Sequence, residues 1–223
     1  MDYQLLLNII FGILALSAIV YFWFKSYHEK REERIASIAT SDHLQLPDFE
    51  NYHTNQQHNF NQYLKENKVL VVFLRHFGCT FCRSTIAFLS DERLFLEAKG
   101  IEVLFVHPGS EEQATRAFER WNYADAHWVA DPELKLYNTF HLKKGNFKQL
   151  FGIETWIEGF KFGIIGKKGV GLKQEGNGFQ MPGVFYVQDG IVKAKFIHER
   201  ASDMPDYLEL LAYSKDYIQQ SVN

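Results

Sequence analysis

The cysteine pair Cys79 and Cys82 constrains this chain most, because the two residues lie three apart at a predicted junction between a strand and a helix. Residues 69–74 are apolar and rich in valine, which predicts a buried strand. Gly78 then allows a short turn. The apolar residues that follow have the spacing of one helix face: Phe81, Ile86 and Leu89.

This position gives the first cysteine special chemistry. The first turn of a helix carries unpaired backbone N–H groups and the positive end of the macrodipole, and both favour a thiolate at Cys79. The thiolate is the reactive form of cysteine, and Cys82 lies one turn further on, close enough to resolve a mixed disulfide or a sulfenic acid. The motif therefore predicts redox chemistry.

Two other interpretations of the pair carry less weight. Tetrahedral zinc requires four ligands, but the chain has no second CxxC, and His76 is the only histidine nearby. Two inert buried cysteines would not require this spacing at a strand-to-helix junction. The remaining histidines form no recognisable triad or metal spacing, so we expect no metal and no organic cofactor.

Composition excludes several classes of protein. The net charge of −3 and the pI near 6.3 argue against a nucleic-acid partner, which would require a concentrated basic face. Two cysteines in 223 residues exclude a secreted scaffold held together by disulfides. The length allows one folded domain with appendages.

The main appendage is N-terminal. Residues 5–24 contain no charged side chain over twenty positions, enough for a helix to cross the ~30 Å core of a bilayer. Four basic residues follow the span and none precedes it: Lys25, Lys30, Arg31 and Arg34. The positive-inside rule therefore predicts a single-pass membrane protein with its N-terminus outside and its folded domain in the cytoplasm. A cleaved signal peptide and an apolar helix within the fold are the alternatives.

Three regions are expected: an anchor at residues 1–24, a juxtamembrane linker at 25–53 and an α/β domain at 54–223. Thr54 is a candidate cap for a helix that precedes the first strand. We expect further strands at residues 101–106 and 127–130, a helix from Ser110 between them, and another helix from Asp131 onward. This alternation predicts a sheet with parallel strands.

The last third of the chain begins with a glycine-rich insertion, residues 145–183, which holds ten of the fifteen glycines. Its apolar residues, Trp156, Ile157, Phe160 and Ile164 among them, would serve as core, as a lid over the cysteines or as a membrane contact. After it, Asp189-Gly190 between two β-rich runs predicts a hairpin. A closing helix from Asp206 to about residue 220 would pack Leu208, Leu211 and Tyr213 on the sheet.

Four segments are informative together: residues 73–83 (FLRHFGCTFCR), 130–137 (ADPELKLY), 182–187 (PGVFYV) and 198–200 (HER). Through them, from about Leu64 to Leu211, the chain resembles the AhpC/TSA-like, peroxiredoxin-like branch of the thioredoxin superfamily. The resemblance implies a thioredoxin-like α/β fold with a mixed central sheet flanked by helices. It also implies a thiol-dependent oxidoreductase or antioxidant peroxidase that cellular thiols recycle.

The resemblance extends to individual residues. A typical peroxiredoxin has Pro-x-x-x-Thr-x-x-Cys, which neither cysteine matches here, so the site is closer to thioredoxin, with Cys79 as nucleophile and Cys82 as resolving thiol. In thioredoxin-like proteins a cis proline before the third core strand faces the CxxC, and the backbone before it pairs with substrate. Met181 and Pro182 are expected to take these roles; the alternative is a trans proline that opens an edge strand.

Three polar residues beside the cysteines are candidates for supporting roles. Arg75 and Arg83 would favour the thiolate by their charge, unless they are solvated surface residues. His76 would act as a proton shuttle or would serve in packing or capping.

The function expected from these features is that of a membrane-anchored thiol oxidoreductase. It would reduce protein disulfides or peroxides and would be reset by thioredoxin or a low-molecular-weight thiol. The alternatives are a plain disulfide reductase without peroxidase activity and a non-enzymatic anchored adaptor on a thioredoxin fold.

Overall fold

A computed structural model of the chain describes residues 51–145, 179–199 and 203–212, Phe49, and residues 3–4, 12, 15–22 and 25–26 of the N-terminal segment. The chain divides into two compact units, Met1–Ala39 and Thr40–Asn223. The second unit holds the α/β domain.

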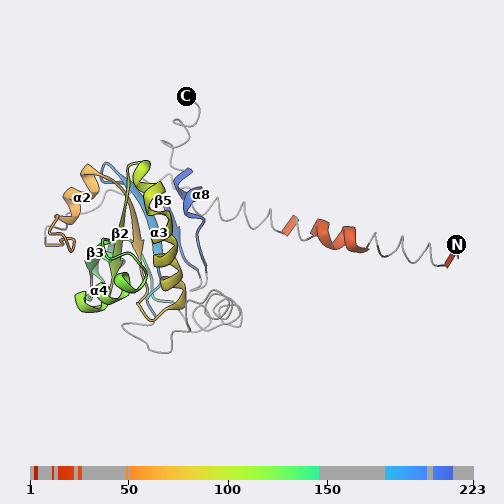
Figure 1. Cartoon of the computed structure of the whole chain (residues 1–223), viewed down its shortest axis with the longest axis horizontal. Helices are drawn as coiled ribbons and strands as arrows, with labels where there is room; N and C mark the ends of the chain where they lie inside the picture. The colour runs from red at the N-terminus through yellow and green to blue at the C-terminus, as the bar shows by residue number, and fades with distance from the viewer. Residues whose placement is uncertain are drawn as a thin grey trace, which may run out of the picture. The chain divides into compact units, whose positions relative to one another are not determined.

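A mixed five-stranded sheet forms the centre of this domain, in the order β3-β2-β1-β4-β5 (Figure 1). The strands are β1 (Lys68–Phe73), β2 (Ile101–His107), β3 (His127–Ala130), β4 (Gly183–Gln188) and β5 (Ile191–Ile197). β1, β2 and β3 run parallel, whereas β4 pairs antiparallel with β1 and with β5. The thioredoxin-like fold with a mixed sheet predicted from the sequence is therefore present.

Five described helices accompany the sheet: α2 (Phe60–Glu66), α3 (Thr80–Ala98), α4 (Glu111–Arg120), α5 (Lys135–Thr139) and α8 (Tyr207–Ala212). Successive side chains of a strand point to opposite faces of the sheet, so alternate residues of β1 pack into two different layers. Val69, Val71 and Phe73 join residues of α2 and α5 in one apolar cluster. On β2, Phe105 packs against Phe118 of α4, with ring centroids 4.9 Å apart.

The predicted elements around the cysteines are confirmed with small changes of boundary. Both parallel strands that flank the site, β1 and β2, lie where the apolar runs indicated. The predicted hairpin joins β4 to β5, and its two turn residues have positive φ angles, 54° at Asp189 and 70° at Gly190. Asp-Gly tolerates this conformation better than almost any other pair, which explains the strength of the signal.

Two predictions about helix ends are wrong. The N-cap of α2 is Asn59, whose Oδ1 accepts a hydrogen bond from the Gln62 N–H (3.0 Å), and not Thr54. The Thr54 hydroxyl instead accepts hydrogen bonds from the N–H groups of Gln56 and His58, and so closes the turn before the helix. The helix expected directly after Asp131 begins later, at Lys135, because Leu134 adopts a left-handed conformation with φ of 58°.

For the closing helix, the prediction that Leu211 is buried is confirmed, whereas that for Leu208 is wrong. Tyr207, Leu210 and Leu211 are buried, whereas Leu208 is 45% exposed. The buried set follows the i, i+3, i+4 spacing of a helix that packs on one side, and Tyr207 had not been assigned to it. Tyr213 lies outside the described residues.

The predicted anchor and the glycine-rich insertion fall mostly outside the described residues. Residues 15–22 are helical, and their side chains are exposed. Among the residues that the structure describes, no helix combines the length and apolar character needed to cross a membrane. Of the insertion, only residue 145 and residues 179–183 are described.

The carboxylate of Asp131 organises the short helix α5. Asp131 is fully buried, and its two oxygens accept hydrogen bonds from the N–H groups of Lys135, Leu136 and Tyr137 at 2.8–3.2 Å. The Tyr52 hydroxyl donates to the same carboxylate at 2.9 Å. A five-residue helix has little stability of its own, so this cap holds α5 in place.

We therefore expect Asp131→Ala to lower the free energy of unfolding by about 3 kcal/mol, because it leaves the buried N–H groups of Leu136 and Tyr137 and two partly buried donors without an acceptor. Urea unfolding monitored by circular dichroism measures this change. Asp125→Ala is the matched control, since Asp125 forms only an exposed ion pair with Arg93 (3.1 Å) and should cost less than about 1 kcal/mol. Equal losses in the two variants would contradict this role of Asp131.

Candidate functional site

The two cysteines lie where β1 gives way to α3. Cys79 is the N-cap of α3, and its N–H donates to the His76 carbonyl oxygen (3.1 Å), which closes a tight turn after the strand. Cys82 lies in the first turn of the helix, and its Sγ accepts a hydrogen bond from the Arg75 N–H (3.3 Å). Both thiols are buried, and no disulfide joins them. The sequence motif thus folds into the strand–turn–helix junction that it predicted.

The environment makes the two thiols unequal. The pKa of Cys79 is lowered to about 6, chiefly because the Cys82 side chain hydrogen-bonds to its sulfur. Burial opposes this shift, whereas the charge of Arg75 and the backbone N–H groups of Phe81 and Cys82 support it. The pKa of Cys82 is raised, first by the hydrogen bond to Cys79 and then by burial. At neutral pH the arrangement therefore favours a thiolate on Cys79 and a thiol on Cys82.

The three polar residues expected to support the cysteines take different positions. Arg75 is buried and contributes positive charge near Cys79. Arg83 is half-buried, and its Nε donates to the Phe77 carbonyl oxygen (3.0 Å), which ties the helix to the preceding loop. Burial, together with the charges of these two arginines, lowers the pKa of His76 to about 4, so its ring is neutral at pH 7. The His76 carbonyl oxygen closes the turn before α3 by accepting from the Cys79 N–H.

Pro182 lies on the Cys82 side of the site. Both residues line one cavity of about 10 Å³, close to the volume that a single water occupies. The cavity is also lined by Thr85 of α3 and by three residues from the C-terminal part of the domain: His198, Met204 and Tyr207. The Tyr207 hydroxyl donates to Thr85 Oγ1 (3.2 Å), which links α8 to α3 behind Cys82.

The cis bond expected before Pro182 is a wrong prediction, since no peptide bond in the described residues is cis. The trans form is the intrinsic preference even before proline, by about 0.5–1 kcal/mol. Two backbone hydrogen bonds hold the residues of this bond: the Met181 N–H donates to the Lys143 carbonyl oxygen (3.2 Å), and the Pro182 carbonyl oxygen accepts from the His198 N–H (3.4 Å). Met181 itself is buried.

Sequence reasoning missed several residues that surround the site. Tyr137 is fully buried, and its hydroxyl donates to the carbonyl oxygens of Leu74 and Val106 at the ends of β1 and β2. Burial also lowers the pKa of His198 to about 3, which leaves a neutral ring in the Cys82 cavity. Both residues lie in segments that carry the family resemblance, and that resemblance is the sequence signal that could have identified them.

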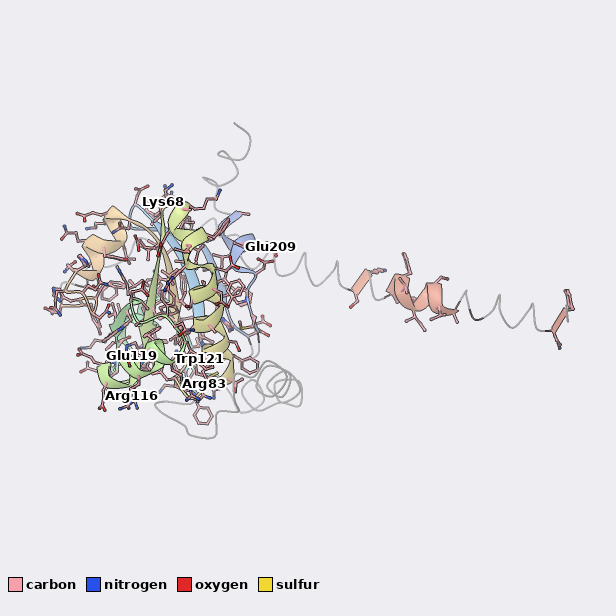
Figure 2. All side chains as sticks on the ribbon, in the orientation of Figure 1. Lys68, Arg83, Arg116, Glu119, Trp121 and Glu209 are labelled. Carbon is pink, nitrogen blue, oxygen red and sulfur yellow. The ribbon has the colours of Figure 1, made fainter. Side chains whose placement is uncertain are left out.

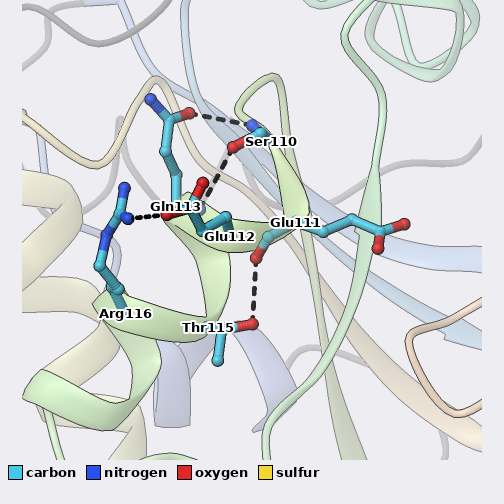
Figure 3. A network of polar contacts seen from close by, with 6 residues as sticks. All are labelled: Ser110, Glu111, Glu112, Gln113, Thr115 and Arg116. Atoms are coloured by element: carbon cyan, nitrogen blue, oxygen red, sulfur yellow. Dashed lines mark hydrogen bonds and ion pairs between the residues drawn. The ribbon is translucent and has the colours of Figure 1, made fainter.

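The loop before Cys79 is held from the side of α4. Phe77 packs against His107, with ring centroids 4.9 Å apart, and against Phe118 of α4 at 5.9 Å. Gly109 lies so close that a Cβ added there would come within 3.1 Å of the Phe77 ring, so glycine allows this approach. A capping box fixes the start of α4: the Ser110 hydroxyl accepts from the Gln113 N–H, and the Gln113 side chain accepts from the Ser110 N–H (Figure 3).

Within the described part of the chain, no three His, Cys, Asp or Glu side chains are grouped closely enough to hold a metal ion.

Fold and site together define a thioredoxin-like α/β protein with a CxxC pair. Residues 88–202, just over half of the chain, match the family model described as AhpC/TSA antioxidant enzyme. The chain belongs to this family of thiol redox proteins. The matched segment begins after both cysteines, so membership rests on the scaffold and leaves the roles of Cys79 and Cys82 to be tested.

One curated relative is the chloroplastic thioredoxin-like protein AAED1 of Arabidopsis thaliana, 32% identical over 81 residues. The alignment covers 36% of this chain and 32% of the relative, so the chain matches about a third of that protein's length.

Solved structures share the fold at low identity. The bacterioferritin comigratory protein of Xanthomonas campestris, studied for alkyl peroxide reduction, is 14% identical with a TM-score of 0.55, over 78% of this chain and all of its own. Peroxiredoxin 6 of Arenicola marina is 10% identical with a TM-score of 0.58, over 83% of this chain and 76% of its own. A putative thiol:disulfide interchange protein DsbE from Chlorobium tepidum is 15% identical with a TM-score of 0.50, over 78% of this chain and 99% of its own.

The hydrogen bond from Cys82 to Cys79 generates a prediction about pH. Because the pKa of Cys79 is lowered to about 6, the rate of Cys79 alkylation by iodoacetamide should rise between about pH 5 and 7 and then level off. Cys82→Ala removes the main cause of the shift and should move the midpoint up by about one pH unit or more.

Cys82→Ser is the matched control, since the serine hydroxyl still donates a hydrogen bond and should keep most of the shift. Alkylation followed by peptide mass analysis gives the rate at Cys79 in each variant. A midpoint near the ~8.5 of an ordinary cysteine in the unaltered chain would contradict this electrostatic account.

Proposed function

We propose that the protein is a thiol oxidoreductase in which Cys79 attacks a peroxide or a disulfide and Cys82 closes the internal disulfide. The observation that carries the proposal is the asymmetry of the pair. Cys79 caps α3 with a lowered pKa, and Cys82 lies behind it with a raised pKa and a hydrogen bond to the Cys79 sulfur. A nucleophile held as thiolate beside a protonated partner is what dithiol exchange requires.

With a hydroperoxide, the Cys79 thiolate attacks the terminal oxygen, the O–O bond breaks, and the alkoxide leaves as an alcohol after gaining a proton. Cys79 becomes a sulfenic acid. The Cys82 sulfur then attacks the Cys79 sulfur, the S–O bond breaks and water leaves. The peroxide gains two electrons, and the dithiol becomes a disulfide.

With a disulfide substrate, the Cys79 thiolate displaces one sulfur and forms a mixed disulfide. Cys82 then displaces the second substrate thiol and closes the same internal bond. The absence of the Pro-x-x-x-Thr-x-x-Cys motif before either cysteine favours this reaction as the main one. Met181 and Pro182 are proposed to border the substrate, as the resemblance to thioredoxin-like proteins implies, and Pro182 does lie beside Cys82.

The reset of the internal disulfide requires two electrons from thioredoxin or from a low-molecular-weight thiol. A non-enzymatic adaptor on this fold is the competing function, and it would survive loss of both thiols.

We also propose that residues 5–24 anchor the protein in a membrane as a single span, with the N-terminus outside and the domain from residue 54 in the cytoplasm. The twenty uncharged residues and the basic residues after them support this proposal.

The order of the two thiols is tested by trapping. Treated with hydrogen peroxide, Cys82→Ser should accumulate a sulfenic acid on Cys79, which dimedone labels, because no resolving thiol is left. The unaltered chain should instead lose two hydrogens and become inaccessible to alkylation. Cys79→Ser should react at least about tenfold more slowly. Labelling of Cys82 at the faster rate would reverse the assignment, and activity in a variant that lacks both cysteines would favour the adaptor.

The topology is tested by protease treatment of intact cells. A cytoplasmic domain should stay uncut until the membrane is permeabilised, because only the N-terminus would face outward. A cytoplasmic enzyme and an outward-facing tag serve as controls. Digestion of the domain in intact cells would place it in an oxidising compartment and would contradict the proposed orientation.

A further inference from the structure

A basic groove borders the cysteine loop on the side of α4. Its volume is about 610 Å³, and it is lined by Phe77, Gly78, Arg83, Arg116, Arg120 and Trp121, among others. We propose that this groove binds a low-molecular-weight thiol that carries carboxylates and presents its sulfur to Cys79 during reset. The inference rests on the function proposed above and assigns a site and a chemical class to its reductant.

The position of the groove follows from the residues that flank the cysteines. Gly78 directly precedes Cys79, and Arg83 directly follows Cys82, so the residues on either side of the CxxC turn line the groove. Figure 2 shows Arg83, Arg116 and Trp121 gathered at the end of the domain where α3 begins, opposite the end marked by Lys68. Cys82 lines the separate small cavity beside α8, whereas Cys79 directly follows Gly78 of the groove wall.

The charge of the groove favours an anion. Three arginines and one carboxylate, Glu119, line it. Arg116 is paired with Glu112 one turn earlier, as Figure 3 shows, which leaves Arg83 and Arg120 as the main source of positive charge. Arg83 is held in place by its bond to Phe77, and Arg120 lies over the Trp121 ring at 5.8 Å from its centroid. Among the described residues, neither forms an ion pair with a carboxylate.

The size and the apolar surfaces point to a small molecule. Small-molecule sites commonly enclose about 300–1,000 Å³ and combine apolar walls with a few polar groups. Phe77 and Trp121 supply apolar surface, and the guanidinium groups supply fixed donors for carboxylates. A protein reductant would instead require a broad contact surface.

The proposed step balances as ordinary thiol exchange. The bound thiolate attacks the Cys79 sulfur, the Cys79–Cys82 bond breaks, and Cys82 leaves and takes up a proton. A second thiolate attacks the sulfur of the small thiol in the mixed disulfide and releases the Cys79 thiolate. Two small thiols are oxidised to their disulfide, and the protein dithiol is restored.

The test uses the full chain, oxidised and held in a neutral detergent, and three reductants that differ in charge. Glutathione carries two carboxylates, β-mercaptoethanol is neutral, and cysteamine is cationic. The second-order rate of disulfide reduction is measured with each by acid quench and thiol alkylation. Arg120→Glu is compared with Lys65→Glu, which likewise reverses an exposed basic residue in the last turn of a helix, α2.

We expect Arg120→Glu to lower the ratio of the glutathione rate to the β-mercaptoethanol rate (the glutathione ratio) about three- to tenfold. The ratio of the cysteamine rate to the β-mercaptoethanol rate should rise. Lys65→Glu should leave both ratios unchanged. In the unaltered chain the glutathione ratio should fall with added salt, a readout that needs no variant.

Two results would overturn the inference. If β-mercaptoethanol reduces the disulfide but the glutathione ratio responds neither to Arg120→Glu nor to salt, the groove is not the site and the proposed function stands. If no Cys79–Cys82 disulfide forms, the proposed function fails and the inference falls with it.

Discussion

The hydroxyl of Tyr137 is the contact on which the site depends. It donates to the carbonyl oxygens of Leu74 and Val106, where two parallel strands end and the chain leaves the sheet. Without it these buried acceptors would lose a partner at the point where the cysteine loop begins. Tyr137 is in turn fixed because Asp131 caps the short helix that carries it. A carboxylate almost fifty residues downstream of the cysteines thus determines where β1 gives way to the CxxC turn.

Burial then separates the roles of the two thiols. Cys79 receives the open first turn of α3, the nearby charge of Arg75 and a hydrogen bond from its partner. Cys82 is enclosed by Pro182, His198 and Tyr207, in a cavity with room for about one water. In the proposed function, Cys79 is therefore the sulfur that meets an external molecule, and Cys82 acts within the protein.

Much of the fold could be predicted from local patterns. The apolar runs of β1 and β2, the Asp189-Gly190 turn and the cap at Ser110 each depend on neighbours in sequence, and each is confirmed. The cysteine junction could be located in the same way, because a CxxC between an apolar run and a helical pattern is a local signal.

The errors have tertiary causes. The start of α5 depends on the left-handed backbone of Leu134 and on the distant acceptor Asp131, and the buried face of α8 depends on what Tyr207 meets across the domain. None of these contacts is encoded by spacing alone, and the same holds for the residues that enclose Cys82.

The reduction potential of the Cys79–Cys82 pair tests the central claim most directly. Equilibration of the full chain with defined ratios of reduced and oxidised dithiothreitol or glutathione, read by alkylation and intact mass, gives this value. A redox-active dithiol with a stabilised Cys79 thiolate should behave as a two-electron couple between about −270 and −120 mV, the range of thioredoxin-fold oxidoreductases. A potential below about −300 mV, typical of a structural disulfide, or the absence of a two-electron couple would contradict the account.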